Sequence, residues 1–200
     1  NVSKIIVIPS YDIETREAIK NFNCKIIEQV GEGFGSALIE GINEVDTKYL
    51  CIFNADGSFD PNDLNRMLTI CKNDLDFVFA SRYLKDAGSD DDTFLTFIGN
   101  KIFSFTGKLF FNMKLHDILY AFYLSDVKKI KKLKLKQQDF TIALEVPLKI
   151  QNFNQTYIEI PSKERKRISG RKKVREFIDG FKLLKYMSFF FLKFVLFKIY

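Results

Sequence analysis

The chain contains few histidines and few cysteines. Its single histidine, His116, excludes a histidine-rich metal site. Three cysteines include no Cys-x-x-Cys pair and cannot all pair with one another, so we expect Cys24, Cys51 and Cys71 to be reduced, as in a cytosolic protein. The sequence does not begin with Met and has no charged and then apolar leader. We therefore expect no signal peptide and treat the sequence as a fragment of a longer product.

Several common motifs and all internal repeats are also absent. The stretch GEGFGSALIEG (residues 31–41) has neither the Lys-Ser/Thr ending of a Walker loop nor the GxGxxG spacing, which excludes an NTPase and a Rossmann dehydrogenase. The acidic stretch DAGSDDD (86–92) lacks the spacing of an EF-hand, which favours a surface lid loop over a calcium site.

What the chain does have is the length of one domain and a strongly uneven charge. It has 200 residues, of which 46% are hydrophobic. Residues 1–100 carry 9 Lys/Arg against 17 Asp/Glu, a net charge of −8, whereas residues 101–200 carry 22 against 8, a net charge of +14. We expect the two halves to contact different partners.

Short β-rich runs alternate with segments of helical spacing in the first 85 residues. The expected strands are KIIVIP (4–9), CKIIEQV (24–30), KYLCIF (48–53) and DFVFAS (76–81), and the expected helices are ETREAIKNF (14–22), the amphipathic segment opened by the glycines at 31–35, and PNDLNRMLTICKN (61–73). This alternation predicts an α/β fold with a largely parallel sheet covered by helices.

The pattern changes after about residue 86. Residues 93–113 are too long and aromatic for a strand, and we expect one or two helices whose apolar face lies against the sheet: Phe94, Phe97, Ile98, Ile102, Phe105, Leu109 and Phe110. Further along, QDFTIALEVPLKIQ (138–151) predicts a helix that carries Glu145, and QTYIEIPS (155–162) predicts a final strand.

Polar side chains follow the expected strand at 48–53, in the stretch FNADGSFDPNDL (53–64). A carboxylate beside a polar oxygen at a strand end suits Mg²⁺ or Mn²⁺, which could neutralise charge developing on a leaving nucleotide diphosphate. In the structural alternative, Asn54, Asp56 and Ser58 only form a turn and cap the helix that begins at Pro61.

Seven motifs in order resemble glycosyltransferase family 2, the inverting sugar-nucleotide transferases of GT-A fold. The resemblance covers nearly the whole chain, and its second half is most similar to the dolichol-phosphate mannosyltransferase and related polyprenyl-phosphate group. The motifs are GEGFGSALIEGI, FNADGSFDP, FASRYL, GNKIFSFTGKLFF, HDILYAFYL, DFTIALEVPLK and EIPSKERKRISGRKKVREFIDGF. The fold that this implies is a Rossmann-like, mostly parallel sheet flanked by helices.

The resemblance implies a donor site. The Asp-x-Asp of the family falls on Asn54 and Asp56, so Asp56 would bind Mg²⁺ or Mn²⁺ together with the donor diphosphate, and Ser58 stands where some members place a second metal ligand. Gly33, in the glycine-rich motif, would also belong to the nucleotide-binding site.

The resemblance also implies catalytic and acceptor residues. Arg82 matches the arginine of the family's Ser-Arg near the phosphates, and Asp117 matches an acidic residue that many relatives use as a base toward hydroxyl acceptors. Arg167, Gly170 and Lys173 fit the R-x-x-G-x-x-K part of the late basic motif, which would bind donor or acceptor phosphate.

The chain departs from the family pattern in two places. Asn54 replaces the first Asp of the pair, which removes a negative charge, although an amide oxygen can still accept a hydrogen bond or ligate a cation. The stretch IIVIPSYDIET (5–15) lies where the family has its second strand and a DDGS loop, and only Asp12 could substitute for the missing acidic pair; its text instead resembles the first strand, IPxYNE. We expect a first strand to be lacking, through truncation, or the nucleotide pocket to be lost.

The C-terminal stretch combines charge with aromatic residues. Eight Lys/Arg and one Glu lie in residues 163–175, a run that is either a solvated face or a binding surface, and an amphipathic segment follows with Val174, Phe177, Ile178, Phe181 and Leu184 on one side. The last fourteen residues, MSFFFLKFVLFKIY (187–200), fall short of the ~20 needed to cross a bilayer. We expect a domain at 1–173 and, at 174–200, an in-plane anchor or the beginning of a membrane helix.

Together these features predict an inverting glycosyltransferase at the cytoplasmic face of a membrane. A polyprenyl phosphate acceptor would need no general base, whereas a hydroxyl acceptor would use Asp117. The rival hypotheses are a catalytically impaired transferase-like scaffold and a nucleic-acid-binding module. The last is disfavoured because the aromatic residues are segregated into apolar helices instead of alternating with the basic ones.

Overall fold

The computed structural model describes residues 2–170 and 174–197 of the chain. In chain order the elements are β1 (Ile5–Pro9), α1 (Ile13–Ile19), β2 (Lys25–Gln29), α2 (Phe34–Asn43), β3 (Tyr49–Ile52), α3 (Pro61–Cys71), β4 (Phe77–Ser81), β5 (Gly88–Ser89), α4 (Phe94–Phe111), β6 (Tyr123–Asp126), α5 (Val127–Lys132), α6 (Ile142–Asn152), β7 (Tyr157–Pro161), β8 (Lys163–Glu164), α7 (Glu176–Phe190) and the π-helix η1 (Phe191–Leu196). The predicted alternation of strands and helices is therefore confirmed, as are the helix at 142–152 and the strand at 157–161.

The strands form three sheets instead of one largely parallel sheet. β1 and β2 pair in parallel, and the short strands β5 and β8 form a second parallel pair. The four-stranded sheet has the order β3-β6-β4-β7, in which β6 runs antiparallel to both neighbours and β4 and β7 are parallel. We did not predict β6, because YLSD has no clear alternation of apolar and polar residues. Three of its four residues are buried, since both faces of the sheet are covered.

One edge of β1 and one edge of β3 have no partner strand among the described residues. Helix α2 packs against β1 and β2 and also contacts α5, so it connects the β1–β2 sheet to the rest of the fold. The expected lack of a first strand stays a prediction.

The core lies on both faces of the four-stranded sheet, and β4 is buried along its whole length. On one face the core includes Phe77 and Phe79 of β4 together with side chains of α6 and α7. On the other face Val78 packs with Met67 of α3. Each such buried side chain stabilises the fold by roughly 1.5–3 kcal/mol.

Helix α7 contributes to this same core through Leu183, Met187 and Phe190. Its Lys182 also binds Asp139, in the segment before α6, at 2.7 Å. The division of the chain at 173/174 stays a prediction, and the structure places the described part of the second segment against the first. No helix within the described residues is both long and apolar enough to cross a bilayer.

The orientation of α4 corrects the prediction. Residues 94–111 do form one helix, but the face that packs inward carries Asn100, Ser104, Gly107 and Phe111. Small side chains allow this close approach: the Ser104 hydroxyl accepts a hydrogen bond from the Ile118 N–H at 3.1 Å, and a Cβ on Gly107 would lie 3.0 Å from the Ile118 side chain. The seven apolar residues expected against the sheet are all exposed.

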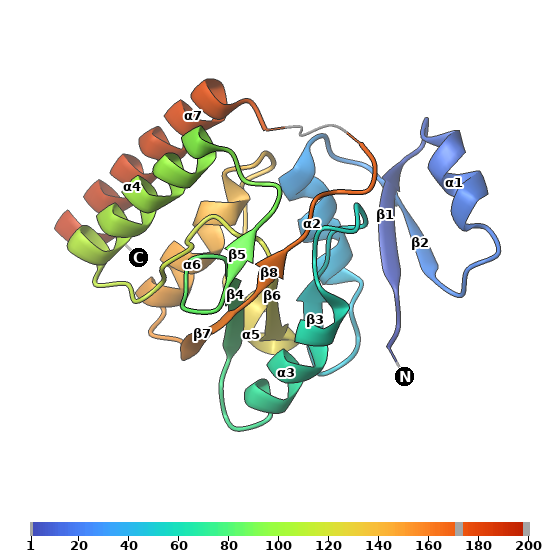
Figure 1. The fold of residues 1–200 in the computed structure, drawn as a ribbon, viewed down its shortest axis with the longest axis horizontal. Coiled ribbons are helices and arrows are strands. Elements are labelled where there is room, and N and C mark those ends of the chain that lie inside the picture. Colours follow the sequence, from blue (N-terminus) through green and yellow to red (C-terminus); the bar gives the residue numbers. More distant parts are fainter. Residues whose placement is uncertain (1, 171–173, 198–200) are drawn as a thin grey trace.

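Figure 1 shows α4 and α7 side by side as an outer layer of the molecule. Both helices also contact α6, which lies between them and the four-stranded sheet. Contacts between aromatic rings join α4 to α7 and η1. The ring centroids of Phe111 and Phe190 are 6.0 Å apart, and those of Phe110 and Phe191 are 5.4 Å apart.

Candidate active site

The predicted site residues lie after three strands that run in the same direction. β3 and β4 are both antiparallel to β6, and β7 is parallel to β4, so the carboxyl ends of β3, β4 and β7 share one edge of the sheet. Asp56 follows β3, Arg82 follows β4, and Arg167 follows β7 and β8. This edge is where α/β sheets bind ligands.

The loop after β3 is a tight turn around Asp56. Its Oδ1 accepts hydrogen bonds from the Ser58 N–H at 3.0 Å and the Ser58 hydroxyl at 2.6 Å. Gly57, between them, has φ +83°, and a Cβ there would lie 2.5 Å from the Ile168 side chain. The cap of α3 is Asp60, which accepts from the Asn62 N–H at 3.1 Å. The turn of the structural alternative is therefore present, whereas the capping role belongs to a different residue.

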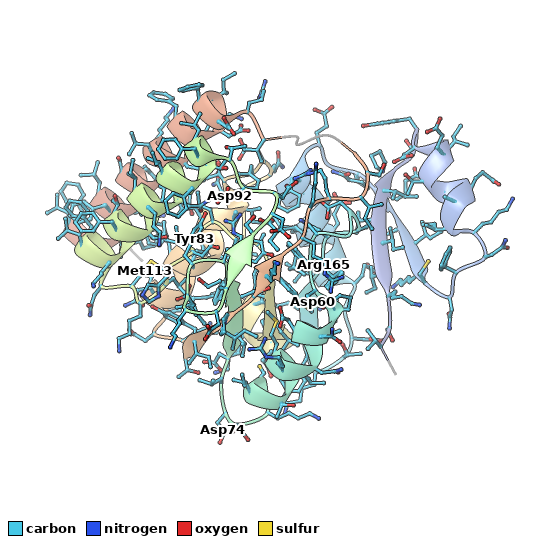
Figure 2. The ribbon with its side chains drawn as sticks, in the orientation of Figure 1. Asp60, Asp74, Tyr83, Asp92, Met113 and Arg165 are labelled. Carbon is cyan, nitrogen blue, oxygen red and sulfur yellow. The ribbon has the colours of Figure 1, made fainter. Side chains whose placement is uncertain are left out.

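The basic segment after β7 is bound to this turn. The Ile168 N–H donates to the Asp56 carbonyl and the Arg165 N–H donates to the Ser58 carbonyl, each at 2.8 Å. Arg165 also pairs with Asp60 at 2.8 Å, and Figure 2 shows these two side chains together. Arg167 places Nη1 3.9 Å from Asp56 Oδ2. The predicted donor residue Asp56 and the predicted acceptor residue Arg167 therefore lie in one site.

Arg82 and Asp117 form a buried, bidentate ion pair. Arg82 donates from Nε to Asp117 Oδ2 at 2.7 Å and from Nη2 to Oδ1 at 2.9 Å, and its backbone N–H donates to Oδ2 at 3.0 Å. The side chains are 9% and 0% exposed. Burial alone would lower the pKa of Arg82, but the hydrogen bonds and charge of Asp117, with the charge of Glu164, raise it well above its ordinary value.

This geometry limits what Asp117 can do in the structure. Both of its carboxylate oxygens accept hydrogen bonds from Arg82, so the carboxylate holds the guanidinium in one orientation. The role of Asp117 as a base toward a hydroxyl acceptor stays a prediction.

Three residues that the sequence analysis did not assign to the site connect Arg82 to Arg167. Glu164 accepts from Arg82 Nη1 at 3.1 Å and from the Ser89 hydroxyl at 2.5 Å. The Ser89 Oγ in turn accepts from the Asp91 N–H at 3.2 Å. Asp91 binds Arg167 through Nη2 at 2.6 Å and Nε at 3.1 Å.

The outcome is a continuous series of contacts, from Arg82 through Glu164, Ser89, Asp91 and Arg167 to Asp56, which we call the site network. Hydrogen bonds to Asp91 raise the pKa of Arg167. The sequence carries one signal for Glu164, as the one acid in the basic run at 163–175, but no signal for its partners. The stretch 86–92, expected to be a surface lid loop, is held in place by the β5–β8 pair and by Asp91.

An open hollow of about 310 Å³ adjoins the network. Arg82 and Ser89 line one part of it, and Phe94 and Phe97 of α4 line another. The site thus offers a guanidinium beside apolar rings. Two N–H groups of Arg82 are not used by Asp117 or Glu164, since a guanidinium side chain has five.

Two other predicted residues, Gly33 and Asn54, lie outside the network. Gly33, with φ +92°, precedes α2 and packs against the 136–141 segment, where a Cβ would lie 2.5 Å from the Gln138 carbonyl oxygen. Within the described residues, no hydrogen bond or ion pair connects Gly33 or the Asn54 side chain with Asp56. Gly170 has φ +85°, and Lys173 lies outside the described residues.

The residues near Asp56 could accept a cation only with help from a ligand. No group of three His, Cys, Asp or Glu in the described part of the chain could hold a metal by itself. Asp56 is 25% exposed, and Oδ1 is bound by Ser58, which leaves Oδ2, 3.9 Å from Arg167 Nη1, as the oxygen that could contact a cation. Mg²⁺ is often held by one or two carboxylates plus substrate phosphates. The donor set therefore fits a cation that is completed by a diphosphate.

The fold is similar to that of solved glycosyltransferases. Glucosyl-3-phosphoglycerate synthase from Mycobacterium tuberculosis in complex with UDP has a TM-score of 0.67 and 10% identity, over 94% of this chain and 68% of that one. The same enzyme with Mn²⁺, UDP-glucose and phosphoglyceric acid has the same TM-score, identity and coverage. Mannosyl-3-phosphoglycerate synthase from Rubrobacter xylanophilus has a TM-score of 0.67 and 11% identity, over 94% of this chain and 62% of that one.

A search of curated protein sequences found no match. The family model described as "Glycosyl transferase family 2" matches residues 4–134, which is more than half of the chain. The α/β fold of GT-A type and the nucleotide-sugar transferase activity expected from the motifs are therefore confirmed at the level of the family: the chain belongs to glycosyl transferase family 2.

Proposed function

We propose that the chain transfers a sugar, with inversion at the anomeric carbon, from a nucleotide-sugar donor to a polyprenyl phosphate. The observation that carries this proposal is the site network, because it joins Asp56 to Arg82 and so connects a place for a donor diphosphate with a cationic, partly apolar hollow.

On the donor side, Asp56 and Ser58 would hold Mg²⁺ or Mn²⁺ together with the diphosphate. Such a cation would neutralise charge that develops on the leaving nucleotide diphosphate. Arg167 lies close enough to Asp56 to bind the same diphosphate, and an arginine can bind two phosphate oxygens at once. The solved relatives crystallised with UDP and Mn²⁺ or Mg²⁺ support a donor site of this kind.

On the acceptor side, Arg82 would bind the phosphate of the acceptor while Phe94 and Phe97 contact its apolar part. A phosphate oxygen is already ionised at neutral pH, so it needs no general base. The phosphate oxygen of the acceptor forms the new bond to the anomeric carbon from the face opposite the diphosphate. The bond between that carbon and the donor diphosphate breaks, and its electron pair leaves with the nucleotide diphosphate. The relative crystallised with phosphoglyceric acid supports an acceptor that carries a phosphate. The proposal that this acceptor is a lipid is supported by the apolar lining of the hollow and by the resemblance to the polyprenyl-phosphate group.

A second candidate function is a transferase-like scaffold without activity. It is favoured by Asn54, which lacks the charge of the usual Asp, and by the two hydrogen bonds that already occupy Asp56 Oδ1. The two functions differ in whether the chain binds a nucleotide through a metal.

The test is calorimetric titration of UDP and of GDP into the full chain, with and without Mn²⁺. We expect one nucleotide to bind only with the metal, and Asp56→Asn to abolish binding. Asp74→Asn is the matched control, because Asp74 lies in the loop between α3 and β4, far from Asp60 and Arg165 in Figure 2. If neither nucleotide binds to the folded chain, the scaffold hypothesis replaces the transferase.

A further inference from the structure

The outer layer of α4 and α7 turns an apolar face away from the rest of the molecule. Each helix, with η1 and Phe197 counted with α7, exposes eight large apolar side chains. Those of α4 are Phe94, Leu95, Phe97, Ile98, Ile102, Phe105, Leu109 and Phe110, and those of α7 and η1 are Phe177, Ile178, Phe181, Leu184, Phe189, Leu192, Leu196 and Phe197. We call this surface the α4–α7 face.

The face reverses the usual arrangement of a surface helix. In α4, Asn100 and Ser104 are buried at 7% exposure each, whereas Ile102 is 59% and Phe105 65% exposed. A surface helix normally turns its apolar stripe to the core. Exposed apolar surfaces made of several neighbouring side chains mark sites of interaction with proteins or membranes.

The charges on the face are mainly positive. Helix α4 contains no acidic residue, and Lys101 and Lys108 are exposed on it. In α7 the acids Glu176 and Asp179 lie only in the first turn, and Asp179 is buried, whereas Lys185 is exposed further along. An anionic surface would be attracted to this face.

This charge pattern selects between two possible occupants. In a symmetric dimer of this chain through the same face, its lysines would lie near those of the second copy and repel them. Anionic headgroups would instead pair with the lysines, each of which would add about fivefold to the affinity, while the phenyl rings enter the boundary of the acyl chains. Neither helix can cross a bilayer, so the face would lie in the plane of the surface.

We propose that the α4–α7 face binds flat to an anionic lipid bilayer, at the cytoplasmic face of a membrane. Phe94 and Phe97 belong both to this face and to the hollow beside Arg82, so binding would bring the hollow to the level of the headgroups. The inference rests on the exposed side chains and does not depend on the proposed transferase activity.

The test uses the fact that the chain contains no tryptophan. Phe105→Trp and, separately, Phe181→Trp place a single indole on α4 or α7, and Phe22→Trp is the matched control, because Phe22 is equally exposed at 65% but lies between α1 and β2. Vesicles of phosphatidylcholine with phosphatidylglycerol should shift the emission of the first two variants to the blue and leave the control unchanged. Brominated lipids should quench the same two.

The contribution of charge is tested by Lys108→Gln combined with Lys185→Gln. We expect the binding to anionic vesicles to weaken about 25-fold, since each of the two lysines adds about fivefold. Absence of a shift with anionic vesicles would overturn the proposal, and so would equal binding to vesicles of phosphatidylcholine alone. A blue shift that grows with protein concentration without vesicles would assign the face to a second copy. Nucleotide titration of the same variants tests the transferase separately.

Discussion

Removal of the Asp117 carboxylate should destabilise the fold, because it leaves Arg82 buried with Glu164 as its remaining carboxylate partner among the described residues. Breaking a buried ion pair by removing one partner typically costs 3–5 kcal/mol. Glu164 still accepts from Arg82 Nη1 at 3.1 Å, so we expect Asp117→Ala to fall at the lower end of this range, about 3 kcal/mol. For a chain of this size that is a fall of roughly 6–12 °C in Tm.

The assay is urea unfolding followed by circular dichroism, with the mutants arranged as a double-mutant cycle. Arg82→Met and Asp117→Leu should each destabilise, and the double variant should recover much of the loss because apolar residues can replace a buried pair. Glu44→Ala is the control, since it breaks an exposed pair with Lys25 at 2.6 Å and should leave the midpoint unchanged.

The same variants separate the two roles of Asp117. If it holds Arg82, stability falls together with activity. If Asp117→Ala costs less than about 1 kcal/mol, the structural argument from the buried pair is refuted. A stable Asp117→Asn variant that has lost transfer to a hydroxyl acceptor would support the base predicted from the sequence instead.

Three further perturbations follow from the structure. Gly57→Ala forces a side chain into φ +83° and toward Ile168, and we expect it to cost about 1–2 kcal/mol and to weaken nucleotide binding in calorimetry. Burial alone would raise the pKa of Asp139, but hydrogen bonds from Lys182 and Thr141 lower it to about 2 from 3.8, so the stability that it adds is present above about pH 4 and lost as the pH falls toward 2. Since both side chains are more than a third exposed, Asp139→Asn should cost less than about 1 kcal/mol at pH 7 in urea unfolding. Burial raises the pKa of Cys51 to about 12, so its thiol should react with Ellman's reagent at pH 8 only after unfolding.

Each of these has a control and a contrary result. Gly180→Ala meets no atom within 4 Å and lies inside a helix, so it should not destabilise; equal effects at Gly57 and Gly180 would contradict the tight turn. Lys182→Met should reproduce the pH profile of Asp139→Asn, and a difference from wild type that stays constant down to pH 2 would refute the linkage. Rapid labelling of Cys51 in the native chain would contradict its raised pKa.

The sequence predicted the helices and strands better than it predicted which face of a helix packs against the core. The period of apolar residues in 94–110 correctly indicates a helix with one apolar face, but a period cannot tell whether that face turns to the core or to the outside. That choice is made by tertiary contacts of Ser104 and Gly107 with Ile118, in the segment that follows the helix, and these contacts are invisible in the local pattern.

In the site, too, the positions of some residues could be predicted from the sequence, whereas the contacts between them could not. The strand-end positions of Asp56 and Arg82 could be predicted, because a residue that follows a strand in an α/β sheet is placed by the fold. The links through Glu164, Ser89 and Asp91 could not, because they depend on the pairing of β5 with β8, two strands of two residues each that carry no periodic signal.

The uneven charge along the chain takes on a different meaning in the structure. An acidic first half and a basic second half were expected to contact different partners, yet part of that charge is neutralised inside the molecule, where Arg165 pairs with Asp60 and Arg167 with Asp91. These pairs bind the basic segment across the ends of the strands, so the site is formed where the two halves meet. The exposed Lys101, Lys108 and Lys185 of the α4–α7 face are outside these two pairs, so their charge can act on an external partner. The basic residues of the second half would thus have two roles: some form ion pairs that assemble the site, and the lysines of the α4–α7 face would attract an anionic membrane.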